Sequence, residues 1–181
     1  MPGGGKSTVG RHLARRLRTS FVDMDALIER RIGCPIRAFF EREGEERFRD
    51  IESSTLDELI PATQGVVATG GGIVLRDTNR QLLRERTLCV YLRSTPEELI
   101  RRVRHDTKRP LLQVADPLAR LRELFATRDP LYCDAAHFIV ETGRPSVPVL
   151  VNMVLMQLEL AGAIDPQDAP SLIDVPDATA P

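Results

Sequence analysis

Cysteine is scarce in this sequence, and no apolar run approaches the length of a membrane span. Its three cysteines, Cys34, Cys89 and Cys133, are an odd number without C-x-x-C spacing. This pattern argues against a disulfide framework and against a zinc site. We therefore expect free thiols, a reducing cytoplasmic location and no membrane partner.

The chain also has almost no net charge and very little lysine. The 181 residues carry a formal charge of -1 at pH 7, so we expect no general attraction to nucleic acid or to membrane surfaces. Lysine occurs twice, against 23 arginines. Because arginine binds carboxylates and phosphates through paired hydrogen bonds, this bias fits anionic ligands, although genome composition is a sufficient explanation for most of it.

What the sequence does contain is an alternation of short apolar runs with amphipathic segments. The apolar runs predict strands over residues 20–25, 65–72, 87–92 and 137–140. The amphipathic segments predict helices over 6–18, 25–32, 35–42, 45–60, 95–104, 117–128 and 146–161. Such alternation predicts an α/β fold in three layers, a parallel sheet covered by helices on both faces.

Composition changes near the end of the chain. Residues 162–181 contain four prolines, four aspartates and neither lysine nor arginine. We therefore expect one domain over residues 1–161, followed by a disordered acidic tail over 162–181.

The chain opens with MPGGGKSTVG, the closing half of the phosphate-binding pattern G-x-x-x-x-G-K-[ST]. Glycines such as Gly5 let backbone N–H groups turn inward around a phosphate, and the following helix adds its positive end. Lys6 could reach the β- and γ-phosphates, and the Ser7 hydroxyl could bind Mg²⁺. The first glycine of the pattern would fall before residue 1, so a glycine turn ahead of a capped helix remains an alternative.

Two aspartates follow the first predicted strand. Asp23 and Asp25 of FVDMD lie at the carboxyl end of that strand, where open α/β sheets bind ligands. Their carboxylates could hold Mg²⁺ with its water and accept a proton from a substrate hydroxyl. A pair of helix-capping residues is the alternative interpretation.

Arginines and glycines supply the remaining candidates. In ERFRDIE, Arg49 and Glu52 lie three apart on one helix, so an oriented guanidinium could bind a carboxylate substrate; a solvated surface pair is the alternative. The run TGGG lets a ligand lie against bare backbone or simply makes a tight turn. Arg109 of KRPLL lies in an irregular stretch, 105–116, that could close over a transferring phosphoryl group. Arg128 of TRDPLY ends a predicted helix, and either arginine alone is most often a surface residue.

Taken together, these six segments resemble the shikimate kinase family, a branch of the P-loop kinases related to nucleoside monophosphate kinases. The family pattern reads GxxGxGKST, F-x-D-x-D, F-R-x-x-E, GGG, R-P-L-L and R-x-P-L-Y. This chain has GGKST, FVDMD, FRDIE, GGG, RPLL and RDPLY in the same order, from residue 2 to about residue 160. The resemblance implies strand order 2-3-1-4-5, with strand 1 absent from these residues.

The resemblance also implies a reaction and its residues. It implies ATP and Mg²⁺ as cofactors, and phosphorylation of the shikimate 3-hydroxyl by a monomer. Residues implied at the nucleotide are Gly3, Gly4, Gly5, Lys6, Ser7, Thr8, Arg102, Arg109 and Arg144, and those implied at Mg²⁺ are Ser7 and Asp23. Residues implied at shikimate are Asp25, Arg49, Gly70, Gly71, Gly72 and Arg128, with the two arginines on its carboxylate. The implied catalytic groups are Asp25, at or near the base, Lys6 and the lid residue Arg109.

Two other functions remain open from the residues. One is a gluconate kinase or another small-metabolite kinase of the same fold, which the pairing of Arg49 and Arg128 with GGG and RPLL disfavours. The other is a nucleotide-binding module without turnover, which the incomplete phosphate loop favours. ATP binding without phosphoryl transfer to any small hydroxy acid would indicate the second.

A central strand directly before the phosphate loop is the part of the family pattern that these residues do not supply. An unpaired buried polar group costs about 1–3 kcal/mol, and a domain has only about 5–15 kcal/mol of stability. We expect a true start upstream of Met1, or a shortened chain. We predict that residues 1–181 alone are unstable or poorly active and that about ten upstream residues restore both properties. Cooperative melting at ordinary temperatures together with full ATP turnover would contradict this prediction.

Overall fold

The strands form two separate parallel pairs in the computed structural model, which describes residues 3–103, 116–143 and 145–165. In one pair β1 (Ser20–Asp23) lies beside β2 (Gly65–Ala68), and in the other β3 (Val90–Arg93) lies beside β4 (Phe138–Glu141). In the predicted order 2-3-1-4-5, the β1–β2 pair corresponds to strands 2 and 3, and the β3–β4 pair corresponds to strands 4 and 5. The α/β fold with parallel strands is thus confirmed.

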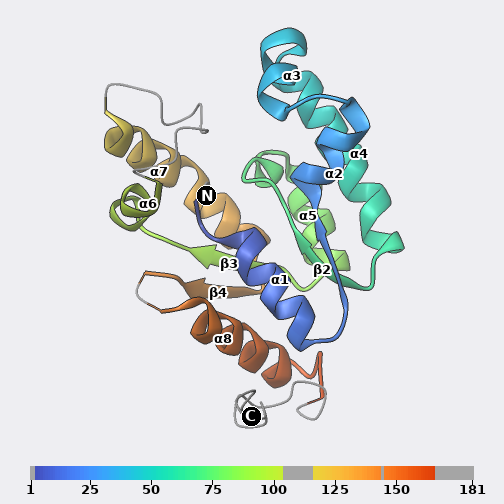
Figure 1. Ribbon diagram of the computed structural model, residues 1–181, viewed down its shortest axis with the longest axis vertical. Coiled ribbons are helices and arrows are strands. Elements are labelled where there is room, and N and C mark those ends of the chain that lie inside the picture. Colours follow the sequence, from blue (N-terminus) through green and yellow to red (C-terminus); the bar gives the residue numbers. More distant parts are fainter. Residues whose placement is uncertain (1–2, 104–115, 144, 166–181) are drawn as a thin grey trace, which may run out of the picture.

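Helices make up most of the remaining described chain. They are α1 (Lys6–Arg16), α2 (Met24–Ile32), α3 (Ile36–Glu43), α4 (Glu45–Ala62), η1 (Ile73–Leu75), α5 (Asp77–Arg86), α6 (Pro96–Val103), α7 (Pro117–Ala135) and α8 (Val147–Leu160). Figure 1 shows α1 between the two strand pairs and α8 beneath β4. No helix in the described ranges is both long and apolar enough to cross a membrane.

Side chains on successive strand residues enter opposite layers. Val66 packs with the apolar cluster of α1 and α8, whereas Val67 packs with the cluster of α2, α4, α5 and α7. On β3 the alternation repeats, since Leu92 joins the first cluster and Tyr91 the second. Helices therefore pack against both faces of each pair, as in the predicted three layers.

The structure departs from the sequence-based prediction in three places. The helix α5 was not predicted, because Leu82 and Leu83 are its only apolar residues; Leu83 and the polar Asn79 provide its buried side. The helix α7 continues past Arg128 to Ala135, although Pro130 lacks an N–H group. Packing compensates for that lost hydrogen bond, since Leu124 before the proline and Tyr132 after it are buried.

The third difference concerns the aspartates. Strand β1 ends at Asp23, whose side chain caps α2 by accepting a hydrogen bond from the Ala26 N–H at 3.3 Å. Asp25 lies in the first turn of α2 rather than in a strand. The helix cap, given above as the alternative interpretation, is therefore present at Asp23. The other carboxylate oxygen of Asp23 still contacts Ser7 of the phosphate loop.

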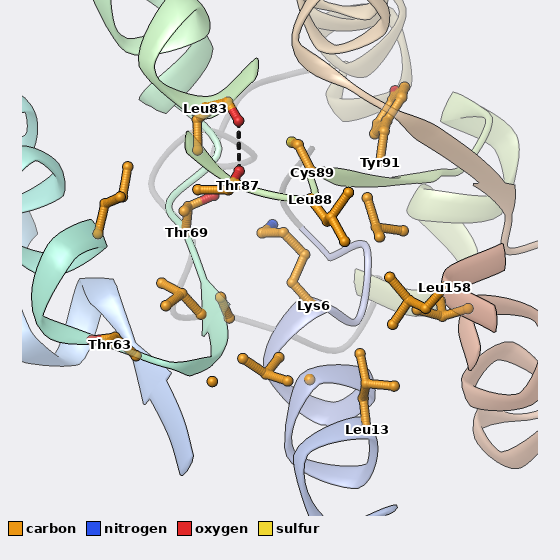
Figure 2. A pocket seen from close by; sticks show the side chains of 18 of the residues that line it. Lys6, Leu13, Thr63, Thr69, Leu83, Thr87, Leu88, Cys89, Tyr91 and Leu158 are labelled. Carbon is orange, nitrogen blue, oxygen red and sulfur yellow. Dashed lines mark hydrogen bonds between the residues drawn. The ribbon is translucent and has the colours of Figure 1, made fainter. Parts of the chain in front are cut away.

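A cavity of about 900 Å³ separates β2 from β3. Its lining includes Lys6, Gly70, Gly71, Leu88 and Gly162. Figure 2 shows Lys6 and Leu88 among the side chains that line it. The predicted strand order places its strand 1 at this position. The predicted lid, except Asp116, and residues 166–181 of the predicted tail lie outside the described residues.

Candidate functional site

The candidate site gathers where the strands end. Asp23 closes β1, the glycine run follows β2, Ser94 follows β3 and Thr142 follows β4. Because parallel strands share one carboxyl edge, segments distant in sequence meet there.

The phosphate loop is fixed to β1 by one short hydrogen bond. Ser7 Oγ donates to Asp23 Oδ2 at 2.7 Å. Gly5 adopts the left-handed conformation with φ of 76° and begins α1, so the first N–H groups of that helix face the loop. A hydroxyl and a carboxylate this close fit Mg²⁺, which takes one or two carboxylates and completes its shell with water and phosphate oxygens.

Asp25 lies against the glycine backbone. A Cβ added at Gly70 would be 2.6 Å from Asp25 Oδ1 and 3.0 Å from an oxygen of Glu52, so a larger residue here would require the Asp25 carboxylate to move. Burial raises the pKa of Asp25, the positive charge of Lys6 opposes this shift, and the charge of Asp23 adds to it. The arrangement gives a carboxylate with increased proton affinity beside the phosphate-loop lysine.

Arg49 is held on both sides by carboxylates. Its Nη1 donates to Glu52 Oε2 at 2.6 Å, and its Nη2 donates to Glu45 Oε1 at 2.7 Å. The side chain of Arg49 is 11% exposed and that of Glu52 is 1% exposed, so the solvated surface pair is wrong. Burial lowers the pKa of Arg49, but its bonds to Glu45 and Glu52 outweigh this effect and raise the pKa. A methyl group at Gly72 would overlap the guanidinium, so Arg49 also lies against the glycine run.

Arg128 reaches the same run from α7. Its Nη1 donates to the Gly71 carbonyl at 3.4 Å, and the Tyr132 hydroxyl donates to that carbonyl at 2.6 Å. Tyr132 stacks on Tyr91, with ring centroids 4.8 Å apart. Tyr132 was missed because the predicted helix ended at Arg128; with the helix continued, a spacing of four places both residues on one face.

Arg102 lies at the carboxyl ends of β3 and β4. Its guanidinium donates to Ser94 Oγ and to Thr142 Oγ1, each at 3.2 Å, and also to the Thr142 carbonyl. These contacts join the ends of β3 and β4, and neither Ser94 nor Thr142 stood out in the sequence. Arg109 and Arg144 lie outside the described residues, so their placement stays a prediction.

Comparison with known proteins identifies the family. The sequence model of the family described as "Shikimate kinase" matches residues 2–159. The chain belongs to the shikimate kinase family. As a member of this family it is an enzyme, a phosphotransferase that uses ATP and Mg²⁺.

Shikimate kinase relatives match nearly the full chain. The shikimate kinase of Paracidovorax citrulli is 57% identical over 169 residues, which are 92% of this chain and 92% of that protein. The shikimate kinase of Ralstonia nicotianae is 56% identical, over 93% of this chain and 89% of that protein. The structure of Acinetobacter baumannii shikimate kinase in complex with shikimate has a TM-score of 0.83 and 43% identity, covering 90% of each chain. This similarity favours a shikimate kinase over a gluconate kinase.

The buried Asp25 gives a pH-dependent prediction. Its pKa is raised by folding, so the stability it contributes is full below its ordinary pKa of 3.8 and is lost as the pH rises through the folded-state pKa. We predict that Asp25→Asn raises the free energy of unfolding at about pH 8, and that this gain disappears near about pH 4. Urea unfolding across this range measures the difference. Asp57→Asn, on the exposed side of α4, is the control, and an equal gain at both pH values would contradict the prediction.

Proposed function

We propose that the chain phosphorylates the 3-hydroxyl of shikimate with ATP between the phosphate loop, α4, α7 and the glycine run. The proposed catalytic domain covers residues 1–161 and acts as a cytoplasmic monomer. The observation that carries this proposal is the placement of two arginines on adjacent glycines. Arg128 donates to the Gly71 carbonyl, and Arg49 lies against Gly72, so two cationic groups from different helices border one short turn.

The proposed acceptor site binds a small carboxylate. Arg49 and Arg128 hold it through charge-assisted hydrogen bonds, and the bare backbone of the glycine run lets the ring approach closely. Because Glu52 and Glu45 already orient Arg49, little side-chain entropy is lost when the substrate binds.

Asp25 is the proposed base at the acceptor hydroxyl. Burial raises the pKa of this carboxyl, and a raised pKa improves its ability to take a proton in the transition state. The nearby charge of Lys6 opposes this rise in the pKa of Asp25 and so favours the ionised form that a base requires.

The proposed donor site lies at the start of α1. Backbone N–H groups of the loop, from Gly3 to Thr8, bind the phosphates together with Lys6, and Ser7 with Asp23 holds the metal. When bound, Mg²⁺ neutralises charge on the phosphate oxygens. Arg102, Arg109 and Arg144 are the proposed contacts to the rest of the nucleotide, with Arg109 at the phosphates. Phosphoryl transfer needs mainly orientation and charge stabilisation, which these proposed donors would supply.

A coupled ADP-release assay tests the function. The full chain, alone and with upstream residues restored, receives ATP with shikimate, with gluconate or without an acceptor. Turnover only with shikimate supports the proposal. Turnover with gluconate supports another small-metabolite kinase, and ATP binding without turnover in both chains supports a binding module.

Arg49 has a direct test on substrate affinity. We predict that Arg49→Ala raises the KM for shikimate by about 10- to 100-fold, because a hydrogen bond to a charged group contributes about 1.5–3 kcal/mol, and leaves the KM for ATP nearly unchanged. Arg49→Lys keeps a charge beside Glu52 and separates the binding effect from misfolding. Arg47→Ala, more exposed on the same helix, is the control. An unchanged KM for shikimate would remove Arg49 from the site.

Asp25 has a test on turnover. We predict that Asp25→Asn lowers kcat far more than it changes either KM, because the amide keeps the shape of the carboxyl but cannot take a proton. Steady-state kinetics with both substrates measure the split. A rate close to that of the unaltered chain would exclude a catalytic role for Asp25.

A further inference from the structure

The carbonyl oxygen of Gly71 has two donors from α7, and their distances differ. The Tyr132 hydroxyl donates to it at 2.6 Å, and Arg128 Nη1 donates to it at 3.4 Å. Most hydrogen bonds in proteins span about 2.5–3.2 Å between donor and acceptor, so the hydroxyl makes a full hydrogen bond and the guanidinium a weak one. Tyr132 is therefore the residue that holds this carbonyl.

Tyr132 is well placed to act as a fixed donor. Its side chain is buried, and burial raises the pKa of its hydroxyl, so the hydroxyl keeps its proton at neutral pH. Its ring stacks on the ring of Tyr91, with an angle of 26° between the two planes. A ring that is packed in this way has few other rotamers, so the hydroxyl is directed at Gly71 before any ligand binds.

Arg128 keeps its charge available to an anion. The carboxylate next to it in sequence, Asp129, is already occupied, because Arg93 donates to it from Nε at 2.9 Å and from Nη2 at 2.7 Å. Among the residues that the structure describes, no carboxylate forms an ion pair with Arg128. Its weak bond to the Gly71 carbonyl is the contact that an incoming anion would have to replace.

The Gly71 carbonyl and a substrate carboxylate would compete for Arg128. A guanidinium binds a carboxylate more strongly than a neutral carbonyl, since both groups are charged and two parallel hydrogen bonds can form. A partly buried carbonyl that loses its donor is destabilised. Because the Tyr132 hydroxyl also donates to this carbonyl, Arg128 can turn to the substrate without leaving the carbonyl unpaired.

We propose that Tyr132 is a positioning residue for the acceptor. By holding the Gly71 carbonyl, it releases Arg128 for the substrate carboxylate and keeps the glycine run in place while Arg128 moves. This inference rests on the proposed function, because it takes the acceptor carboxylate to bind at Arg128. Without the hydroxyl, Arg128 would be the donor left to this carbonyl, and substrate binding would have to break that bond.

Isothermal titration calorimetry of the full chain tests this role without phosphoryl transfer. Tyr132→Phe removes the hydroxyl and keeps the ring that stacks on Tyr91. We expect the Kd of shikimate, measured without ATP, to rise about 3- to 10-fold, as for the loss of one hydrogen bond. The Kd of ATP, measured without shikimate, should stay unchanged, and this unchanged value also shows that the variant is folded.

The second tyrosine of the chain provides a matched control. Tyr91 is buried to a similar extent, and its hydroxyl donates to Asp129 Oδ1 at 2.9 Å instead of to the glycine run. Tyr91→Phe removes a buried hydroxyl from the same stacked pair. It should lower Tm and leave the Kd of shikimate unchanged, which separates the proposed role from a general loss of stability.

A double-variant cycle distinguishes positioning from a purely structural role. If Tyr132 acts through Arg128, its hydroxyl has no further effect on shikimate once Arg128 is removed. The Kd of shikimate for Arg128→Ala combined with Tyr132→Phe should then lie within about twofold of that for Arg128→Ala alone. Independent structural effects would instead multiply.

Three results would overturn the proposal. These are an unchanged Kd of shikimate in Tyr132→Phe, an equal rise in Tyr91→Phe, and multiplied effects in the double variant. Each of them leaves the proposed function intact, provided that the unaltered chain binds shikimate. If the unaltered chain does not bind shikimate, the proposed function and this inference are both wrong.

Discussion

The buried ion pair of Arg49 and Glu52 is the constraint on which the site depends. Breaking such a pair leaves an uncompensated charge and costs about 3–5 kcal/mol, so α4 must keep both residues. Their position in turn restricts the loop after β2. Gly70 is confined by Asp25 and Glu52, and Gly72 by the Arg49 guanidinium. A side chain at Gly70 or Gly72 would therefore displace the charged groups that Arg49 and Glu52 hold in place, in addition to any effect on a ligand.

Charge balance explains why Asp25 and Glu52 behave differently from surface carboxylates. Burial raises the pKa of both, and the charge of Asp25 adds to the rise in the pKa of Glu52. Arg49 counteracts this rise at each of them, and Arg128 does so at Glu52. The arginines that are proposed to bind the substrate thus also favour the charged form of these acids, so folding stability and acceptor binding draw on the same groups.

Much of this arrangement was accessible from sequence, and the remainder has physical reasons. The spacing in FRDIE predicted the contact between Arg49 and Glu52. The alternation of strands with helices predicted that the strands run parallel. Tyr132 was missed because proline normally ends a helix, and only tertiary packing shows that Pro130 does not end α7. The helix α5 was missed because its stabilisation comes from contacts made by few apolar side chains, which leave no clear period.

The hydrogen bond from Tyr132 to Gly71 has a mechanical consequence. Arg93 on β3 holds Asp129, Asp129 accepts from the Tyr91 hydroxyl, and Tyr91 stacks on Tyr132. This relay ties the β3–β4 half of the molecule to the turn that follows β2. A movement of the β3–β4 half relative to the β1–β2 half would therefore be transmitted to the Gly71 carbonyl. The position of the turn after β2 thus depends on how the two halves are packed together.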